Sequence, residues 1–254
     1  MTTDDKNQIN RRAFLKLSAL SSLAPTVLAD QGNSNRKDGV KKYARLGRTN
    51  LKISDISFGS SQLKTGQEQL VHHANSKGVN YFDTADSYTQ GDSELVLGNA
   101  LKKYRHQIII ATKMKAGSRT SQKEMMRSLD QSLTRLQTDH VEILFNHAVN
   151  NKSRLKNEEW FTFTEKAKRL GKIRFTGISG HSGNLIECVD YALDNDLVDV
   201  LLLSYNFGQD PAFYEQFVRS FDWVAVQPEM KRIITKAKQK DIGTIGMKVL
   251  RGQN

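Results

Sequence analysis

Residues 78–88 read Gly-Val-Asn-Tyr-Phe-Asp-Thr-Ala-Asp-Ser-Tyr, and this stretch decides the fold. Its first part, Val79–Asp83, is a short apolar run that we predict to be a strand buried on both faces. Two side chains that can carry chemistry, Asp83 and Tyr88, follow where this strand ends. Active sites of parallel α/β barrels lie at the carboxyl ends of the strands. Residues 78–88 therefore predict both an α/β fold and a site.

The same pattern of a short apolar run followed by a helical segment recurs along the chain. Further strands are predicted at Ile56–Gly59, Ile108–Lys113, Val141–His147, Ile173–Ser179, Val198–Tyr205 and Thr244–Val249. Helices are predicted over residues 121–136, 158–170, 185–195 and 228–240, and the first of these opens with Ser121 and Glu124, a capping box. Repeated βα units predict a parallel sheet, and eight such units close a barrel.

A β-hairpin is predicted ahead of these strands. Lys42–Leu46 and Leu51–Ser54 flank Gly47-Arg-Thr-Asn50, whose Gly and Asn tolerate positive φ. Its expected place is the bottom of the barrel, as a plug. Seven barrel strands are visible before Asn254, so we expect a (β/α)₈ TIM barrel with an N-terminal hairpin, whose eighth strand and helix are missing. Such a barrel would leave two unpaired strand edges.

Ionisable side chains of different types stand at successive strand ends, namely Asp83, Lys113 and His147, with Tyr88 in the first loop. A tyrosine has a reference pKa of about 10, and a neighbouring cation lowers it by stabilising the phenolate. Lys113 can be that cation, and Asp83 can hold Lys113 charged. His147 can hydrogen-bond the carbonyl oxygen that Tyr88 would protonate. The set predicts a general-acid site for carbonyl reduction, with the hydride supplied by a cofactor.

At these residues the chain resembles the aldo/keto reductase family. Residues 78–88 match the family's second-strand motif, and three further motifs follow in order: Ser93-Glu-Leu-Val-Leu-Gly98, Ile110-Ala-Thr-Lys113 and Leu144-Phe-Asn-His147. The spacings of 5, 30 and 34 residues from Asp83 to Tyr88, Asp83 to Lys113 and Lys113 to His147 also fit. Residues 43–51 look like the family's hairpin. The resemblance covers residues 43–254, and four motifs in order make it specific.

The resemblance implies a (β/α)₈ barrel with NADP(H) as cofactor, NAD(H) not being excluded, and an aldehyde or ketone as the small-molecule substrate. Asp83, Tyr88, Lys113 and His147 would form the catalytic tetrad, with Tyr88 as the acid. Cofactor contacts are implied at Gly59, Ser60, Asp83, Ser179, Tyr205 and Met247, and no metal is implied. The chain departs from the family at Gly180, where an asparagine is usual, and at Leu202, where a glutamine is common. It also departs at Met247, where many members place an aromatic ring.

The first thirty residues predict a targeting segment. Residues 10–16 read Asn-Arg-Arg-Ala-Phe-Leu-Lys, and an apolar stretch of small residues follows up to Ala29. This is the order of a signal peptide, and Arg11-Arg12 before Phe14-Leu-Lys16 resembles the twin-arginine export signal. We expect residues 1–29 to be removed and residues 10–16 to engage the twin-arginine machinery. The folded protein would reach the periplasm and touch the membrane only during export. An amphipathic helix of the folded domain is the alternative.

Residues 30–42 are polar and are expected to form a flexible lead-in. The formal net charge is +11, but the basic residues are spread along predicted helices rather than gathered on one face, so no nucleic-acid partner is expected. Cys188 is the one cysteine, which excludes an intrachain disulfide and a four-cysteine zinc site. Its helical context predicts a small core residue, whereas His72 and His73 are expected at the surface.

Three functions from different classes remain open. The first is an exported NADPH-dependent carbonyl reductase formed by residues 43–254. The second is a truncated, non-catalytic barrel fragment or binding module, which the missing eighth unit keeps open. The third is a metal-dependent hydrolase on the same fold, which is disfavoured because Ile56–Ser60 offers no His-x-His. The substrate's identity cannot be read, because substrate loops vary within a fold.

Overall fold

The computed structural model describes residues 39–205 and 229–249. The predicted signal peptide, residues 1–29, and most of the lead-in lie outside the described residues. Near the start of the described part, the Val40 backbone N–H donates to the Lys77 carbonyl at 2.9 Å, and the Val40 side chain packs against the core. Within the described residues, no helix combines the length and the apolar character that a membrane span requires.

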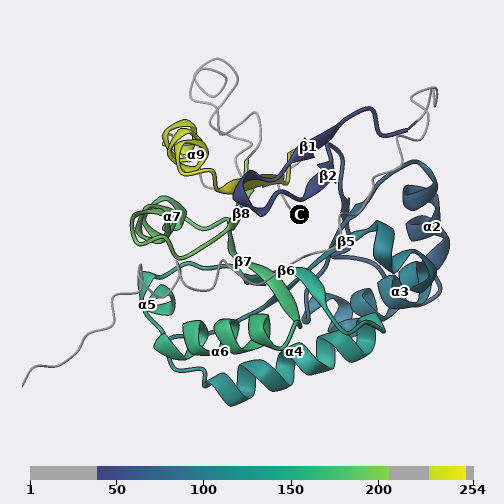
Figure 1. Cartoon of the computed structure of the whole chain (residues 1–254), viewed down its shortest axis with the longest axis horizontal. Helices are drawn as coiled ribbons and strands as arrows, with labels where there is room; N and C mark the ends of the chain where they lie inside the picture. The colour runs from purple at the N-terminus through teal and green to yellow at the C-terminus, as the bar shows by residue number, and fades with distance from the viewer. Residues whose placement is uncertain (1–38, 206–228, 250–254) are drawn as a thin grey trace, which may run out of the picture. The chain divides into compact units, whose positions relative to one another are not determined.

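Seven parallel strands form one sheet in which each strand pairs with the next along the chain (Figure 1). These strands are β3 (Phe58–Gly59), β4 (Tyr81–Asp83), β5 (Ile109–Met114), β6 (Val141–Asn146), β7 (Ile173–Gly180), β8 (Val200–Ser204) and β9 (Gly243–Met247). All seven predicted strands are confirmed, with bounds that differ by a few residues. That the eighth strand and helix of the barrel are missing stays a prediction. In the described part of the chain, β3 and β9 are the outer strands of the sheet.

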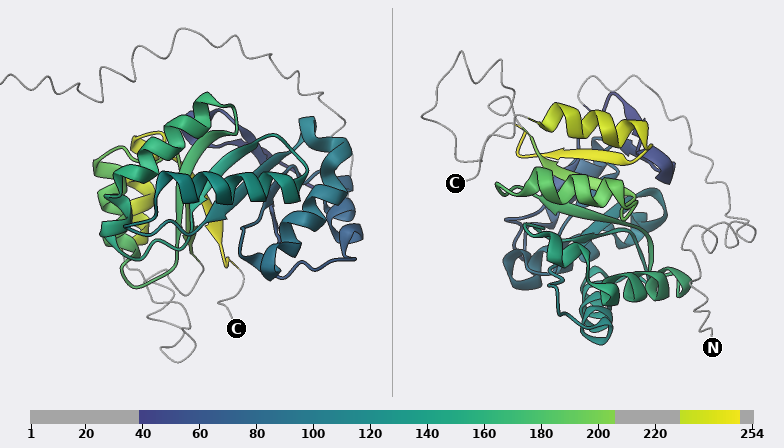
Figure 2. Two further views of the ribbon diagram at one scale, coloured as in Figure 1. Left: turned by 90° about the horizontal axis from the view of Figure 1, so that it is seen from below. Right: turned by 90° about the vertical axis from the view of Figure 1, so that its left-hand side faces the viewer.

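Helices follow the strands and pack on the outside of the sheet, as Figures 1 and 2 show. They are α2 (Glu68–Ser76), α3 (Asp92–Leu101), α4 (Gln122–Leu136), α5 (Lys152–Leu155), α6 (Glu158–Arg169), α7 (Leu185–Asp194) and α9 (Met230–Gln239). The four predicted helices are confirmed. The capping box is present, because the Ser121 hydroxyl accepts from the Glu124 N–H and the Glu124 carboxylate accepts from the Ser121 N–H.

The predicted hairpin is also present: β1 (Tyr43–Arg45) pairs antiparallel with β2 (Lys52–Ser54), and both Gly47 and Asn50 between them have positive φ. The Ser54 N–H donates to the Asn80 side-chain oxygen at 2.7 Å, just before β4. The Arg48 N–H donates to the Asp241 carbonyl at 2.5 Å, just before β9. The hairpin therefore lies at the amino ends of the strands and joins both sides of a curled sheet, as a plug would.

Apolar side chains fill both sides of the sheet. The inner side is filled by hairpin and strand residues, among them Leu46, Ile53, Ile143, Phe145 and Val200. The outer side packs against the helices and contains Cys188, which is fully buried as predicted. His72 and His73 on α2 are exposed, also as predicted. The carboxyl ends of the strands, where the sequence places the site, are thus held from below by a packed core.

Candidate active site

Lys113 organises the carboxyl end of the sheet. It lies near the end of β5, and its side chain is 1% exposed. Its ammonium nitrogen lies 2.5 Å from Asp83 Oδ1, 2.7 Å from the Thr84 carbonyl oxygen and 3.3 Å from the Tyr88 hydroxyl. An ammonium has three hydrogens to donate, so these three acceptors can use all of them. The sequence predicted this cation beside this phenol, and the structure brings them together.

Asp83 ends β4 and balances the charge of Lys113. The pKa of Asp83 is raised, because burial outweighs the opposing effect of the neighbouring Lys113 ammonium. The ion pair favours the ionised carboxylate, since a buried ammonium without a partner is costly. Only Oδ1 is used in this pair, and Asp83 Oδ2 is a buried acceptor without a hydrogen-bond partner in the described part of the protein.

Tyr88 and His147 complete the group. The His147 ring meets the Tyr88 ring edge-on, with centroids 5.5 Å apart and an angle of 81° between the planes. The pKa of His147 is lowered to about 4, chiefly by burial and then by the positive charges of Lys113 and other neighbouring groups. His147 is therefore neutral at pH 7, and the fixed positive charge of the site stays on Lys113. All four predicted catalytic side chains converge, and their catalytic roles stay a prediction.

A cluster of buried hydroxyls supports the β4 end of the site. The Ser93 hydroxyl of α3 lies 2.6 Å from that of Ser60 and 2.7 Å from that of Thr84, and all three residues are at most 1% exposed. The Ser60 hydroxyl donates to the Asp83 carbonyl at 2.7 Å. The Thr84 carbonyl accepts from Lys113. The hydroxyl cluster therefore fixes the backbone segment that binds the lysine. Ser60, predicted to contact the cofactor, directs its hydroxyl into this cluster.

The other residues predicted to bind the cofactor lie in different places. Gly59 is exposed, with open space where a Cβ would stand. Met247 is half-buried and packs against the inner core, and Ser179 is buried at the end of β7. Tyr205 packs instead against the outer core beside the helices, and its N–H donates to the Met247 carbonyl at 3.1 Å. Of this set, the structure places Asp83, Ser179 and Met247 around the inner carboxyl end.

Gly180 follows Ser179 and occupies the position where the sequence departs from the resembled family. A Cβ on Gly180 would overlap the Leu185 side chain and approach the Val149 carbonyl oxygen at 3.3 Å. No side chain can stand there unless Leu185 moves. The Ser179 hydroxyl accepts from the Ala148 N–H at 3.0 Å, so β7 supports the loop that carries His147.

Two buried charged residues, Glu94 and Arg154, were not among the site residues predicted from the sequence, although Glu94 lies within the motif of residues 93–98. Glu94 on α3 is fully buried, accepts from the Thr112 hydroxyl at 2.5 Å and pairs with Arg135 at 2.6 Å. Arg154 on α5 is 7% exposed and contacts the loop of His147. Neither could be found from spacing alone, because charged residues within helices are usually solvated.

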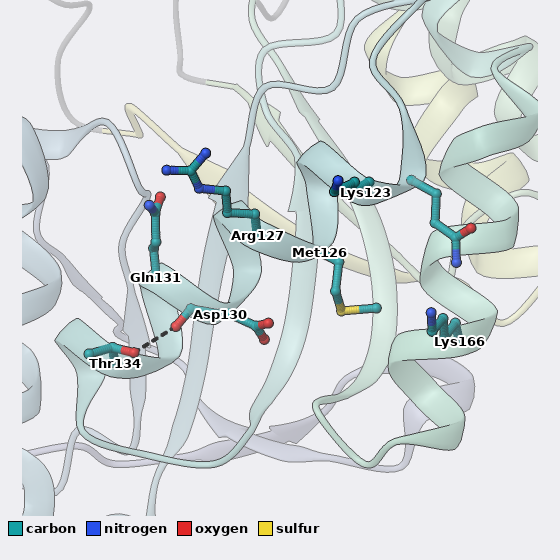
Figure 3. A pocket seen from close by; sticks show the side chains of 8 residues that line it. Lys123, Met126, Arg127, Asp130, Gln131, Thr134 and Lys166 are labelled. Carbon is teal, nitrogen blue, oxygen red and sulfur yellow. Dashed lines mark hydrogen bonds between the residues drawn. The ribbon is translucent and has the colours of Figure 1, made fainter.

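The described part of the protein has a small pocket near the site and a larger groove away from it. A small pocket of about 210 Å³ lies beside the Tyr88 loop, and on its wall Asp86 accepts from the Ser128 hydroxyl at 3.1 Å. A larger, shallow groove of about 570 Å³ lies on the outer face of α4 and is lined by Lys123, Arg127 and Asp130 of α4 and by Lys166 of α6 (Figure 3). This groove faces away from the tetrad and shares no residue with it. The described residues contain no group of three or more His, Cys, Asp or Glu side chains that could hold a metal ion.

The sequence profile of the aldo/keto reductase family matches residues 55–253. The chain belongs to this family. It is 35% identical over 181 residues to L-galactose dehydrogenase of Arabidopsis thaliana, an alignment that covers 64% of this chain and 56% of that protein. It is 30% identical over 181 residues to the oxidoreductase YqkF of Bacillus subtilis (strain 168), covering 66% and 57%. The aligned part thus spans a little more than half the length of these relatives.

Solved aldo/keto reductases share the fold. The holo form of an aldo-keto reductase from Bacillus halodurans superposes with a TM-score of 0.63 at 24% identity, covering 81% of this chain and 65% of that one. An aldo-keto reductase from Klebsiella pneumoniae, solved in complex with NADPH, gives a TM-score of 0.60 at 20% identity, covering 81% and 66%. The α/β fold and family predicted from the sequence are confirmed.

Proposed function

We propose that this protein is an NADPH-dependent reductase of aldehydes or ketones in which Tyr88 is the general acid. One observation carries the proposal: the Lys113 ammonium lies between the Asp83 carboxylate, at 2.5 Å, and the Tyr88 hydroxyl, at 3.3 Å. A cation at that distance stabilises the phenolate that is left when Tyr88 gives up its proton. Asp83 keeps the cation charged and in place.

His147 has a different role in this proposal. Because its pKa is about 4, the imidazole is neutral at pH 7 and can donate an N–H to a carbonyl oxygen without carrying a second positive charge. Its ring lies against that of Tyr88, with centroids 5.5 Å apart, so one small group can lie close to both. A carbonyl oxygen there would accept one hydrogen bond from His147 and the proton from Tyr88.

The residues around the inner carboxyl end fit a nicotinamide dinucleotide. When bound, the reduced cofactor supplies the hydride that reduces the carbonyl carbon. Among the residues that the structure describes, Asp83 Oδ2 is a buried acceptor without a partner, and Met247 offers an apolar surface on the same inner side. The family's Klebsiella member with NADPH supports this choice, and NADH is the alternative cofactor.

The test is a reduction assay on the full chain with NADPH and a panel of aromatic and aliphatic aldehydes. The reaction is monitored through the loss of NADPH absorbance. NADH is tested in parallel, and NADPH binding is measured by calorimetry. Tyr104→Phe, a change at an exposed tyrosine, is the control and should retain activity. NADPH binding without reduction of any carbonyl would favour a non-catalytic binding module, and absence of both would contradict the proposal.

We also propose that residues 1–29 direct twin-arginine export and that the enzyme acts in the periplasm. The support is the sequence of residues 10–16 and the small residues before Asp30. The test fuses residues 1–42 to a reporter and replaces Arg11 and Arg12 by lysine. Export that continues in the double variant would contradict the proposal.

A further inference from the structure

Arg154 is a buried cation bound by neutral acceptors. Its Nε donates to the Ala116 carbonyl at 2.8 Å, and its Nη1 donates to the Ala148 carbonyl at 2.7 Å. Its Nη2 donates to Asn146 Oδ1 at 2.6 Å and to the His147 carbonyl at 2.8 Å. In the part of the chain that the structure describes, none of these acceptors is a carboxylate. Since a desolvated guanidinium is costly, a purely structural need would be met more cheaply by an apolar side chain.

The acceptors of Arg154 lie at the end of β6 and in the loops that follow β5, the strand of Lys113, and β6, after which His147 comes directly. Ala116 lies two residues after β5, and Asn146 is the last residue of β6. Asn146 joins the same loops, because its Oδ1 also accepts from the Ala116 N–H at 3.3 Å. A guanidinium presents its donors in a rigid planar fork, whereas the donors of an ammonium rotate.

The backbone that Arg154 holds is strained. Ala148 has a φ of 50°, a conformation that residues with a Cβ rarely adopt unless their surroundings enforce it. Arg154 holds the carbonyls of His147 and Ala148. From the opposite side, Ser179 holds the amides, since its Oγ accepts from Ala148 at 3.0 Å and its carbonyl accepts from Val149 at 2.8 Å. The turn that presents His147 is therefore fixed from both sides.

We propose that Arg154 is a positioning residue of the active site, which fixes the turn that presents His147 to Tyr88 and places a positive charge beside this turn. Only the expected effect of Arg154 on kcat rests on the proposed carbonyl reduction. Nothing in the sequence motifs of the site points to this residue, which lies in the four-residue helix α5.

The electrostatic part has a defined set of contributors. The pKa of His147 is lowered first by burial and then by Lys113 at the end of β5, His181 after β7, Arg154 on α5 and Lys115 after β5. Lys113 is paired with Asp83, whereas Arg154 has no carboxylate partner in the described chain. Removing the charge of Arg154 should therefore raise the pKa of His147 toward its ordinary value. Arg154→Lys keeps the charge and loses the planar fork.

The experiment separates these two effects with Arg154→Met, Arg154→Lys and the control Arg127→Met, an exposed arginine on α4. The His147 imidazole is titrated by NMR in the full chain, and kcat and KM are measured with NADPH and an aldehyde. We expect Arg154→Lys to keep the low pKa of His147 but to lose about tenfold or more in kcat with little change in KM, since misplacement of a catalytic group slows the reaction itself. Arg154→Met should show the same loss and a raised pKa. Arg127→Met should match the wild type.

An unchanged His147 titration in Arg154→Met, or a wild-type kcat in Arg154→Lys, would overturn the inference. If Arg154→Met does not fold, His147 is titrated in Arg154→Gln, which is neutral and retains an amide donor. If the wild-type protein reduces no carbonyl, the proposed function fails, but the His147 titration in Arg154→Met still decides whether Arg154 sets the state of this ring.

Discussion

Tyr88 is the residue on which the proposed chemistry depends. Replacing it by phenylalanine removes one hydroxyl and leaves the ring that packs against His147. We expect Tyr88→Phe to lower kcat by about 10²–10⁴-fold, because the general acid is lost, while NADPH binding stays close to that of the wild type. Steady-state kinetics and calorimetric titration of NADPH check this prediction. A near-normal kcat in Tyr88→Phe would show that another group gives the proton.

His147 links the site to the pH dependence of stability. Its pKa is about 4 in the folded protein and about 6.5 in the unfolded chain, so only the unfolded state gains a proton between these values. The contribution of neutral His147 to the free energy of unfolding is therefore fully present above pH 6.5 and is lost as the pH falls toward 4. Urea unfolding from pH 8 to pH 4 should show a loss on the order of 2 kcal/mol relative to His147→Asn. Parallel curves for the two proteins would contradict this.

The tetrad could be predicted from the sequence because Asp83, Lys113 and His147 stand at strand ends, which parallel strands bring together, and Tyr88 lies in the loop after the first of these strands. Arg154 and Ser179 show where such reasoning stops. Which hydrogen bonds a buried arginine makes depends on the path of two loops, and strand patterns do not contain that information. The contact between the Ser93 and Ser60 hydroxyls, at 2.6 Å, joins residues that are 33 positions apart, and no local pattern indicates it.

The elements follow the sequence where apolar periodicity is clear. Strands buried on both faces and the amphipathic helix α4 were predicted within a few residues. Helix α3 was not predicted, because Ser93, Glu94, Val96, Gly98 and Leu101 are all buried and the helix has no polar face that would reveal its period. Glu94 could be buried only because Arg135 of α4 and Thr112 of β5 reach it. A local sequence pattern cannot indicate partners that two other elements supply to Glu94.

Gly98 shows how closely two of these helices approach. A Cβ on Gly98 would lie 2.5 Å from the Arg135 carbonyl oxygen and 2.7 Å from the Leu136 carbonyl carbon, both at the end of α4. Alanine normally stabilises a helix by about 0.5–1 kcal/mol relative to glycine. Here we expect Gly98→Ala to lower the free energy of unfolding by about 1–3 kcal/mol, because backbone atoms cannot give way easily. Leu95→Ala, an exposed change on the same helix, is the control for urea unfolding; a stabilised Gly98→Ala would contradict the close contact.

At the scale of the whole folded unit, the hairpin holds the amino ends of the sheet together. Arg48 donates from its side chain to Asp199 at 3.1 Å, Asp196 at 2.7 Å and the Val198 carbonyl at 2.8 Å. Arg45 forms a two-point ion pair with Asp241, but both side chains are about half exposed. Exposed ion pairs contribute little, whereas charge-assisted bonds made by a half-buried fork contribute more.

We therefore expect Arg48→Met to lower the free energy of unfolding by about 1–3 kcal/mol and Arg45→Met to lower it by less than about 1 kcal/mol. The physical reason is that Arg48 fixes the hairpin whose Leu46 and Ile53 close the inner core. Urea unfolding of the full chain measures both values, and binding of a hydrophobic dye reports whether the inner core opens. The tetrad lies at the opposite ends of the strands, so kcat per folded molecule should stay within about twofold of the wild type in both variants. Equal destabilisation by the two changes would mean that the hairpin is held by apolar packing rather than by Arg48.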